Sequence, residues 1–167
     1  YHAWQDLAVD NGYPTSVYVT SCDFTAGNLH NNTGETVTLT EYGYIYKENT
    51  PPTWGDCTKE IVATGVDIAN GADETIAATR LTGLAADTTY YARSYATDGQ
   101  MVWYGDTVAF TTPPNAPPAF NEGDTVALLI DEDSGATDIN NELAATDTNM
   151  YQPLTWSVVS GPSHGTL

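Results

Sequence analysis

The sequence predicts an all-β fold, with one β-sandwich followed by a second, incomplete β-sandwich module. Three observations support this prediction. Apolar and polar residues alternate with a period of two along most of the chain, as in half-buried strands. Turn-forming dipeptides such as Asn70-Gly71 and Asp98-Gly99 separate these segments at the spacing typical of a sandwich. Helical periodicity is almost absent, and only residues 136–146 are compatible with a short helix.

The predicted strands follow one another in six segments. Residues 16–24 alternate between two faces, and residues 35–47 form a longer segment rich in valine, leucine and tyrosine, residues that suit strands. The other predicted strands occur, in order, at 59–64, 74–81, 88–97 and 102–112. Residues 1–15 precede the first predicted strand and are expected to be an extension or the end of a preceding module.

A proline-rich segment divides the chain. Residues 113–118 read Pro-Pro-Asn-Ala-Pro-Pro. Proline cannot donate to a strand ladder and favours an extended, semi-rigid backbone, so this segment is predicted to be a linker. Composition changes across it, because Arg93 is the last basic residue and eight carboxylates follow the linker. The predicted domains are therefore a sandwich over 16–112 and a partial second module over 119–167.

The charge balance excludes several kinds of partner. The 167 residues include 22 acidic and 4 basic side chains, which gives a net charge of −18. Such a chain repels phosphate backbones, so we expect no nucleic-acid binding. No apolar run reaches the roughly 18 residues of a membrane-spanning helix, so we expect no membrane span. The scarcity of lysine and the polar surface of threonine, asparagine and aspartate favour an extracellular or cell-surface location. The start at Tyr1, without methionine, favours a processed product or a fragment.

Cys22 and Cys57 are the two cysteines of the chain. An even pair in a secreted protein favours a disulfide, which would close a loop of ~35 residues and add roughly 3–4 kcal/mol of stability. The alternative is a pair of buried free thiols. A zinc site is not expected, because a second pair of metal-binding residues does not accompany them.

Three segments carry a resemblance to a known family. Residues 81–90 read Leu-Thr-Gly-Leu-Ala-Ala-Asp-Thr-Thr-Tyr, residues 41–46 read Glu-Tyr-Gly-Tyr-Ile-Tyr, and residues 104–112 form a further β-rich segment. In this order they resemble the approach to the penultimate strand, the central strand and the final strand of fibronectin type III-like modules, particularly those of secreted Bacteroidetes proteins. The resemblance covers 16–112 and implies an immunoglobulin-like or fibronectin III-like β-sandwich.

The same resemblance assigns structural roles within the motif. Leu84 occupies its second leucine position, and Tyr90 occupies the position of a tyrosine corner, whose hydroxyl bonds back to nearby backbone. Asp87 replaces the usual glycine and Ala86 the usual proline, so the turn is less pre-set than in most members.

The strand after Tyr90 offers a candidate ligand surface. With a period of two, Ala92, Ser94 and Ala96 are predicted to point inward, and the row at Tyr91, Arg93 and Tyr95 outward. Exposed tyrosine and arginine side chains are typical of surfaces that bind glycans or other proteins. The alternative is an ordinary sheet face with cross-strand pairs.

The second module resembles another family. Residues 126–135 and 154–167 are similar to the cadherin-like tandem repeats of large bacterial surface proteins, and 119–167 would be part of one such repeat. Most members carry an Asp-x-Asp-Gly-Asp calcium loop between these segments. The matching stretch, 147–152, keeps its first aspartate and lacks the glycine.

Calcium is the one cofactor that the sequence suggests. It needs six to eight oxygen ligands, several of them usually carboxylates. Asp131, Asp133 and Asp147 are the candidate ligands. The alternative is an acidic turn exposed to solvent.

Three positions are candidate glycosylation sites. Asn31 begins an Asn-Asn-Thr sequon, and Thr107 and Thr125 each lie in an Asp-Thr-Val triplet that resembles the O-glycan acceptor of Bacteroidetes. The favoured alternative is that both triplets are plain strand entries.

Catalysis finds no support in the sequence, because His2, His30 and His164 lie in no nucleophile or metal-binding motif. The leading interpretation is a structural or adhesive segment of a large extracellular protein, such as an adhesin, stalk or filament subunit. Its partners would be other modules of the same chain or neighbouring subunits joined by strand addition. The alternatives are a glycan- or protein-binding module, with the tyrosine row or Trp54 and Trp103 as a platform, and a spacer beside a secreted hydrolase.

Overall fold

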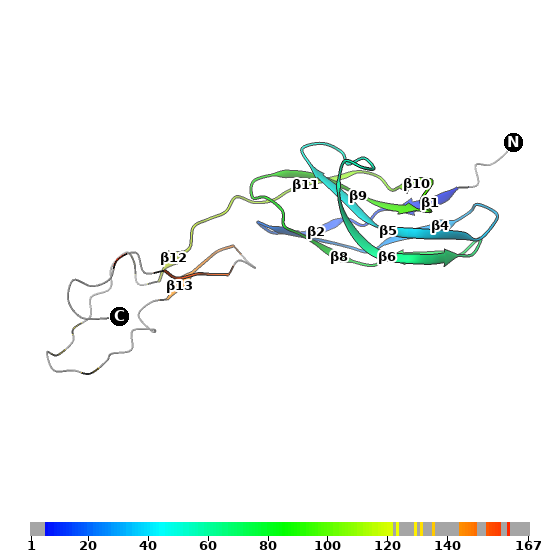
Figure 1. Ribbon diagram of the computed structural model, residues 1–167. Coiled ribbons are helices and arrows are strands. Elements are labelled where there is room, and N and C mark those ends of the chain that lie inside the picture. Colours follow the sequence, from blue (N-terminus) through cyan, green and yellow to red (C-terminus); the bar gives the residue numbers. More distant parts are fainter. Residues whose placement is uncertain are drawn as a thin grey trace. The chain divides into compact units, whose positions relative to one another are not determined.

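The computed structural model describes residues 6–121, 123, 129, 131, 135, 144–149, 153–157 and 160. The chain divides into two compact units, Tyr1–Asn115 and Ala116–Leu167 (Figure 1). Every regular element in the described residues is a β-strand, so the all-β prediction is confirmed. Within the same residues, no helix is long and apolar enough to cross a membrane.

The first unit is an antiparallel β-sandwich of two layers (Figure 1). The first layer has the strand order β10-β9-β5-β6, and β11 also pairs with β9. Its strands are β5 (Val37–Glu48), β6 (Thr58–Ile68), β9 (Thr89–Thr97), β10 (Val102–Tyr104) and β11 (Val108–Thr111). The second layer consists of two short sheets, β1-β4-β7 and β2-β3-β8. Its strands are β1 (Leu7–Asp10), β2 (Pro14–Val17), β3 (Ser21–Phe24), β4 (Gly27–Asn31), β7 (Asp73–Ile76) and β8 (Thr79–Thr82).

The sandwich begins earlier in the chain than the sequence predicts. β1 and β2 pair with β4 and β3, so residues 7–15 belong to the sandwich and are not an extension of it. The predicted strand 16–24 is instead part of a hairpin, because Tyr18 N–H donates to Ser21 O at 2.8 Å and turns the chain. The predicted strand 74–81 is divided between β7 and β8, which lie in different sheets.

The strands of the second layer are interrupted at one level. Each of its three chain segments breaks into two strands: β1 is followed by β2, β3 by β4, and β7 by β8. The breaks lie side by side, because the pairing register places residues 77–78 opposite 25–26. Gly12 lies at this level, where an added Cβ would be 2.2 Å from Thr25 O and 2.6 Å from Tyr44 Oη. Only glycine allows the backbone to approach so closely.

Side chains of the first layer bond to the backbone at this interruption. Tyr44 Oη donates to Thr25 O at 2.9 Å, and Gly12 N–H donates to Ser94 Oγ at 3.3 Å. Ser94 N–H in turn donates to Asn11 Oδ1 at 2.5 Å. The first two bonds satisfy backbone groups of Thr25 and Gly12 that the interrupted ladders leave without strand partners. They therefore join the two layers through the middle of the sandwich.

The core between the layers is rich in aromatic rings. Phe24 contacts Tyr44 and Phe110, with ring centroids 5.4 and 5.7 Å apart, and Tyr90 stacks on Phe110 at 5.7 Å. Each buried large side chain contributes roughly 1.5–3 kcal/mol through removal of apolar surface from water. The predicted inward set on β9 is also buried, and it consists of Ala92, Ser94 and Ala96.

In the second unit, β12 (Ala119–Phe120) pairs antiparallel with β13 (Ala145–Thr146). Residues 145–146 are therefore a strand, where the sequence is compatible with a helix. Phe120 and Trp156 lie with ring centroids 5.6 Å apart, and both remain more than half exposed.

Candidate functional site

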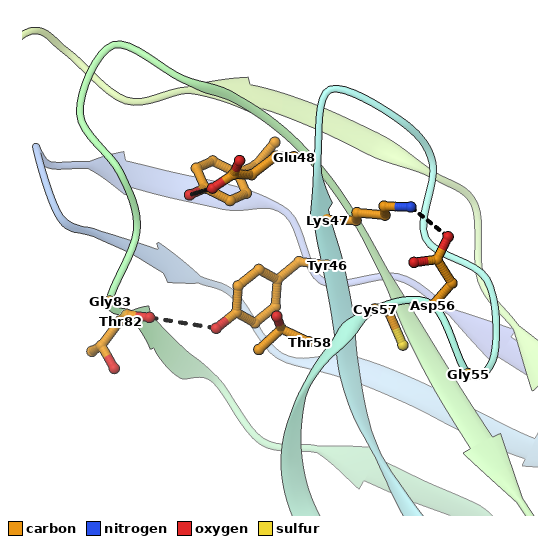
Figure 2. A pocket seen from close by; sticks show the side chains of 10 residues that line it. Tyr46, Lys47, Glu48, Gly55, Asp56, Cys57, Thr58, Thr82 and Gly83 are labelled. Atoms are coloured by element: carbon orange, nitrogen blue, oxygen red, sulfur yellow. Dashed lines mark hydrogen bonds and ion pairs between the residues drawn. The ribbon is translucent and has the colours of Figure 1, made fainter.

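The main candidate site is a groove of about 650 Å³ at one end of the first unit. It lies between the loop that joins β5 to β6, residues 49–57, which we call the cap loop, and the turn that follows β8 (Figure 2). The groove is lined by Tyr46, Lys47, Glu48, Gly55, Asp56, Cys57, Thr58, Thr82, Gly83 and Tyr90. Hydroxyl, carboxylate and ammonium groups dominate this lining, so the groove suits a polar ligand rather than an apolar one.

Two buried tyrosines hold the groove in place. Tyr90 Oη accepts a hydrogen bond from Ala85 N–H at 2.8 Å and donates to Glu48 Oε1 at 2.9 Å. The first bond is the one that the sequence predicts for a tyrosine corner. Tyr46 Oη donates to Thr82 O at 3.4 Å, as Figure 2 shows. These bonds link the end of β5 to the turn that follows β8.

The turn before β9 contains a residue other than glycine with a left-handed backbone. Asp87, which stands where most fibronectin type III-like modules have glycine, adopts a left-handed backbone with φ of 48°. Aspartate tolerates this conformation better than most residues with a side chain. Leu84 is buried, and its N–H donates to Thr20 O at 3.0 Å.

We expect Tyr90→Phe to destabilise the first unit by about 1–2 kcal/mol, because the buried Tyr90 ring loses the hydroxyl that bonds to Ala85 N–H and Glu48 Oε1. Chemical denaturation measures the change. The matched control is Tyr91→Phe, since Tyr91 is half-buried on the opposite face of β9. An equal shift of the denaturation midpoint in both variants would contradict the role of the Tyr90 hydroxyl.

The predicted exposed row on β9 is wrong at Tyr95. Tyr95 is fully buried, whereas Tyr91 and Arg93 are half-buried. The physical reason is the cap loop, which packs Trp54 against Tyr95 with ring centroids 5.4 Å apart. Tyr95 Oη donates to Glu41 Oε1 at 3.1 Å beneath this cover. The row is therefore not an open platform.

Three of the four basic residues anchor the cap loop. Lys59 places its Nζ 3.7 Å from the centroid of the Trp54 ring and 2.7 Å from Glu41 Oε1. Lys47 pairs with Asp56, as Figure 2 shows. The third is Arg93, whose Nη2 donates to Pro52 O in the cap loop at 2.6 Å. Exposed pairs of this kind are worth about 0–1 kcal/mol each, so packing contributes more to the cover than charge does.

The two tryptophans that the sequence suggests as a platform lie on different faces. Trp54 is 40% exposed on the cap loop, outside the first layer. Trp103 packs against the core from β10, and its Nε1 donates to Asp6 Oδ1 at 2.5 Å. Only Trp54 therefore offers an exposed ring next to the groove.

The predicted disulfide is wrong, because Cys22 and Cys57 are both free. Cys22 lies on β3 in the second layer and is fully buried in the core. Cys57 ends the cap loop next to the first layer, so the two sulfurs belong to different parts of the sandwich. Burial, assisted by the Asp23 carboxylate, raises the pKa of Cys22 to about 12. Burial also raises the pKa of the Cys57 thiol.

Alkylation of the native protein is expected to modify Cys57 alone, since Cys22 is inaccessible as well as protonated. Mass spectrometry of peptides should show one labelled cysteine before unfolding and two after it. Linked peptides, or equal labelling of both cysteines in the native protein, would contradict this expectation.

The Asn31 sequon is buried rather than displayed. Asn31 Nδ2 donates to Glu35 O at 2.8 Å and to Ile68 O at 2.7 Å, and Asn31 Oδ1 accepts from Thr33 N–H and Thr33 Oγ1. The folded chain therefore cannot present this amide to a glycosyltransferase, and the site is a structural one. Thr107 is exposed, so its glycosylation stays a prediction. Thr125 lies outside the described residues.

The calcium candidates are not brought together among the residues that can be placed. Asp147 Oδ1 accepts from Asn149 N–H at 2.7 Å within a tight turn. Asp133 lies outside the described residues. In the described part of the chain, no three histidine, cysteine or carboxylate side chains are grouped as metal ligands.

The sequence does not reveal the cap loop. The Pro51-Pro52 pair indicates a turn, but nothing in the alternation shows that the turn folds back over a sheet face. The one available signal is the excess of aromatic and basic residues at Trp54, Arg93 and Tyr95, which could cover one another.

No family model and no curated protein matches the chain. Three solved structures of the sensor domain of the anti-sigma factor RsgI4 of Pseudobacteroides cellulosolvens are similar to it. A short form is 12% identical, covers 67% of this chain and 99% of its own, and has a TM-score of 0.42. A long form is 13% identical over 74% and 100%, with a TM-score of 0.40. A solution structure is 13% identical over 95% and 97%, with a TM-score of 0.43. The fold assignment rests on the strand pairing described above.

Proposed function

We propose that this chain is a non-catalytic structural or adhesive segment of a large modular protein at the cell surface. The main support is the division into two compact units on either side of residues 115 and 116, within a segment that contains four prolines. Tandem β units joined by such segments form stiff, extended chains, because proline restricts the backbone between them. The resemblances of 16–112 and 119–167 to surface-protein modules point in the same direction.

The second unit supports a role in assembly. Phe120, Leu154 and Trp156 are exposed apolar side chains, and with Pro118 and Ala145 they line a pocket of about 200 Å³. Exposed apolar surface of this kind marks contact sites with other protein segments. Strands from neighbouring modules or subunits would cover these side chains by strand addition.

The experiment that tests this proposal is surface localisation in the producing cell. Antibodies against the chain should label intact cells, and brief proteolysis of intact cells should release fragments that contain it. Recovery of the protein only after cell lysis would contradict the proposal. A catalytic domain in the released polypeptide would instead identify the chain as a spacer.

A second candidate function is glycan binding at the cap loop. It is favoured by the exposed ring of Trp54 next to a groove lined with hydroxyl and carboxylate groups. Sugars stack on such rings and bond to such groups. Binding on a glycan array that is lost in Trp54→Ala, and kept in a control such as Tyr13→Ala, would support this function.

A further inference from the structure

The cap loop contains a proline dipeptide, Pro51-Pro52, and buries one of its two rings against the first layer. Pro52 is less than 2% exposed, whereas Pro51 and Thr53 on either side of it are exposed. Thr50 and Pro51 each precede a proline, which restricts both to extended backbone. The loop therefore contacts the sheet as a short extended peptide that inserts one proline ring.

The outer face of the first layer near this proline combines apolar and aromatic side chains with one guanidinium group. Ile45 and Tyr95 are fully buried, and the Arg93 guanidinium lies 3.6 Å from the centroid of the Tyr104 ring. Arg93 Nη2 donates to Pro52 O at 2.6 Å. Aromatic rings that hold proline rings, with a donor placed for the peptide carbonyl, are the means by which proteins recognise proline-rich segments.

Arg93 has donors that the cap loop does not use. Its Nε is buried and has no hydrogen-bond partner. In the described part of the chain, the other three basic residues each pair with a carboxylate, while Arg93 does not. A buried donor without a partner costs about 1–3 kcal/mol, so the closed loop satisfies this side chain incompletely.

The cap loop has a left-handed backbone near each of its two ends. Asn49 and Gly55 near its two ends have left-handed backbones, with φ of 57° and 86°. Nothing lies within 4 Å of the position that a Cβ on Gly55 would take. Displacement of residues 50–54 from the sheet would require backbone changes at these two positions only, while β5 and β6 stay paired.

We infer that the outer face formed by Ile45, Arg93, Tyr95 and Tyr104 is a docking site for proline-containing extended segments. Pro51-Pro52 occupies it within the chain, and the linker of a second copy can occupy it in exchange.

The linker of a second copy fits this site for three reasons. The Pro-Pro pair of residues 51–52 occurs again at 113–114 and at 117–118. Pro114, Pro117 and Pro118 are exposed, whereas Thr112 and Pro113 are held by the sandwich. Residues 112–118 carry no charged side chain, so they approach an acidic chain without local repulsion. Replacement of one contact by a like contact from another copy is a low-cost route to association.

The test uses the full chain and a capped peptide with the sequence of residues 112–118. We expect the peptide to bind weakly and to raise the rate of Cys57 alkylation, because Cys57 ends the loop that the peptide displaces. A peptide with alanine at all four prolines should have neither effect. The chain itself should associate as its concentration rises, and the proline peptide should reverse this association.

Matched variants separate this site from other surfaces. Arg93→Lys keeps the charge but loses the planar guanidinium, and should weaken peptide binding by about tenfold. Arg80→Lys, on β8 in the other layer, should leave binding unchanged. Trp54→Ala loosens the cap loop and should strengthen binding.

Absence of peptide binding in both the native chain and Trp54→Ala would overturn the inference, as would self-association that the peptide does not reverse. Surface localisation is a separate readout, so failure here leaves the proposed function standing.

Discussion

Gly12→Ala should destabilise the first unit by about 3 kcal/mol or more, at the upper end of what overpacking costs. The added methyl group would lie 2.2 Å from Thr25 O, which belongs to the neighbouring backbone and cannot rotate away. Movement of that backbone would also break the bond from Tyr44 Oη to Thr25 O. Chemical denaturation followed by tryptophan fluorescence measures the loss.

A second substitution shows whether the backbone or a side chain obstructs the added methyl group. Tyr44→Phe removes the hydroxyl that lies 2.6 Å from the added Cβ, but leaves Thr25 O in place. Gly12→Ala should therefore remain strongly destabilising in the Tyr44→Phe background. Full recovery of stability in the double variant would show that the backbone at the interruption is not the obstacle.

Asn31→Ala has the second largest expected effect, a loss of about 3 kcal/mol. Asn31 is fully buried, and its side chain makes four hydrogen bonds that hold the turn after β4 to the end of β6. Its removal leaves the buried carbonyl of Ile68 without this donor, which costs about 1–3 kcal/mol before the other bonds are counted.

Asn32→Ala is the matched control, because Asn32 is the exposed neighbour in the same turn. Its denaturation midpoint should stay close to that of the native chain. Thr33→Ala should fall between the two, since it removes one of the bonds to Asn31 Oδ1. Similar stability of Asn31→Ala and Asn32→Ala would contradict the structural role of the sequon.

The sequence predicts the long strands better than the short ones. β5 and β9 carry enough alternating residues for their period to be seen, and their predicted and observed bounds differ by few residues. β1 and β4 have four and five residues, too few for a pattern, and Gly27 begins one of them. The interruption in the second layer depends on contacts between distant segments, which no local pattern records.

The candidate site shows the same division between local and distant information. The Tyr90 corner lies within a few residues of its backbone partner, so a local motif predicts it. The burial of Tyr95 depends on Trp54 of the cap loop, about 40 positions earlier, and a contact at this separation leaves no local signal in the sequence. The disulfide prediction fails for a related reason, because an even cysteine count carries no information about which layer each thiol occupies.

The interruption through the second layer also bears on how the sandwich would carry tension. β1 and the linker that follows β11 lie at opposite ends of the first unit (Figure 1), so a pull along the chain would act on β1 and β11 and shear them from β4 and β9. The β1–β4 pair and the β2–β3 pair belong to separate sheets, so the load on β1 would not be shared by β2 and β3. Asn11 and Gly12 follow β1 in the chain, so their bonds to Ser94 of β9 would bear the load next. Detachment of β1 from β4 would therefore precede the separation of β2 from β3.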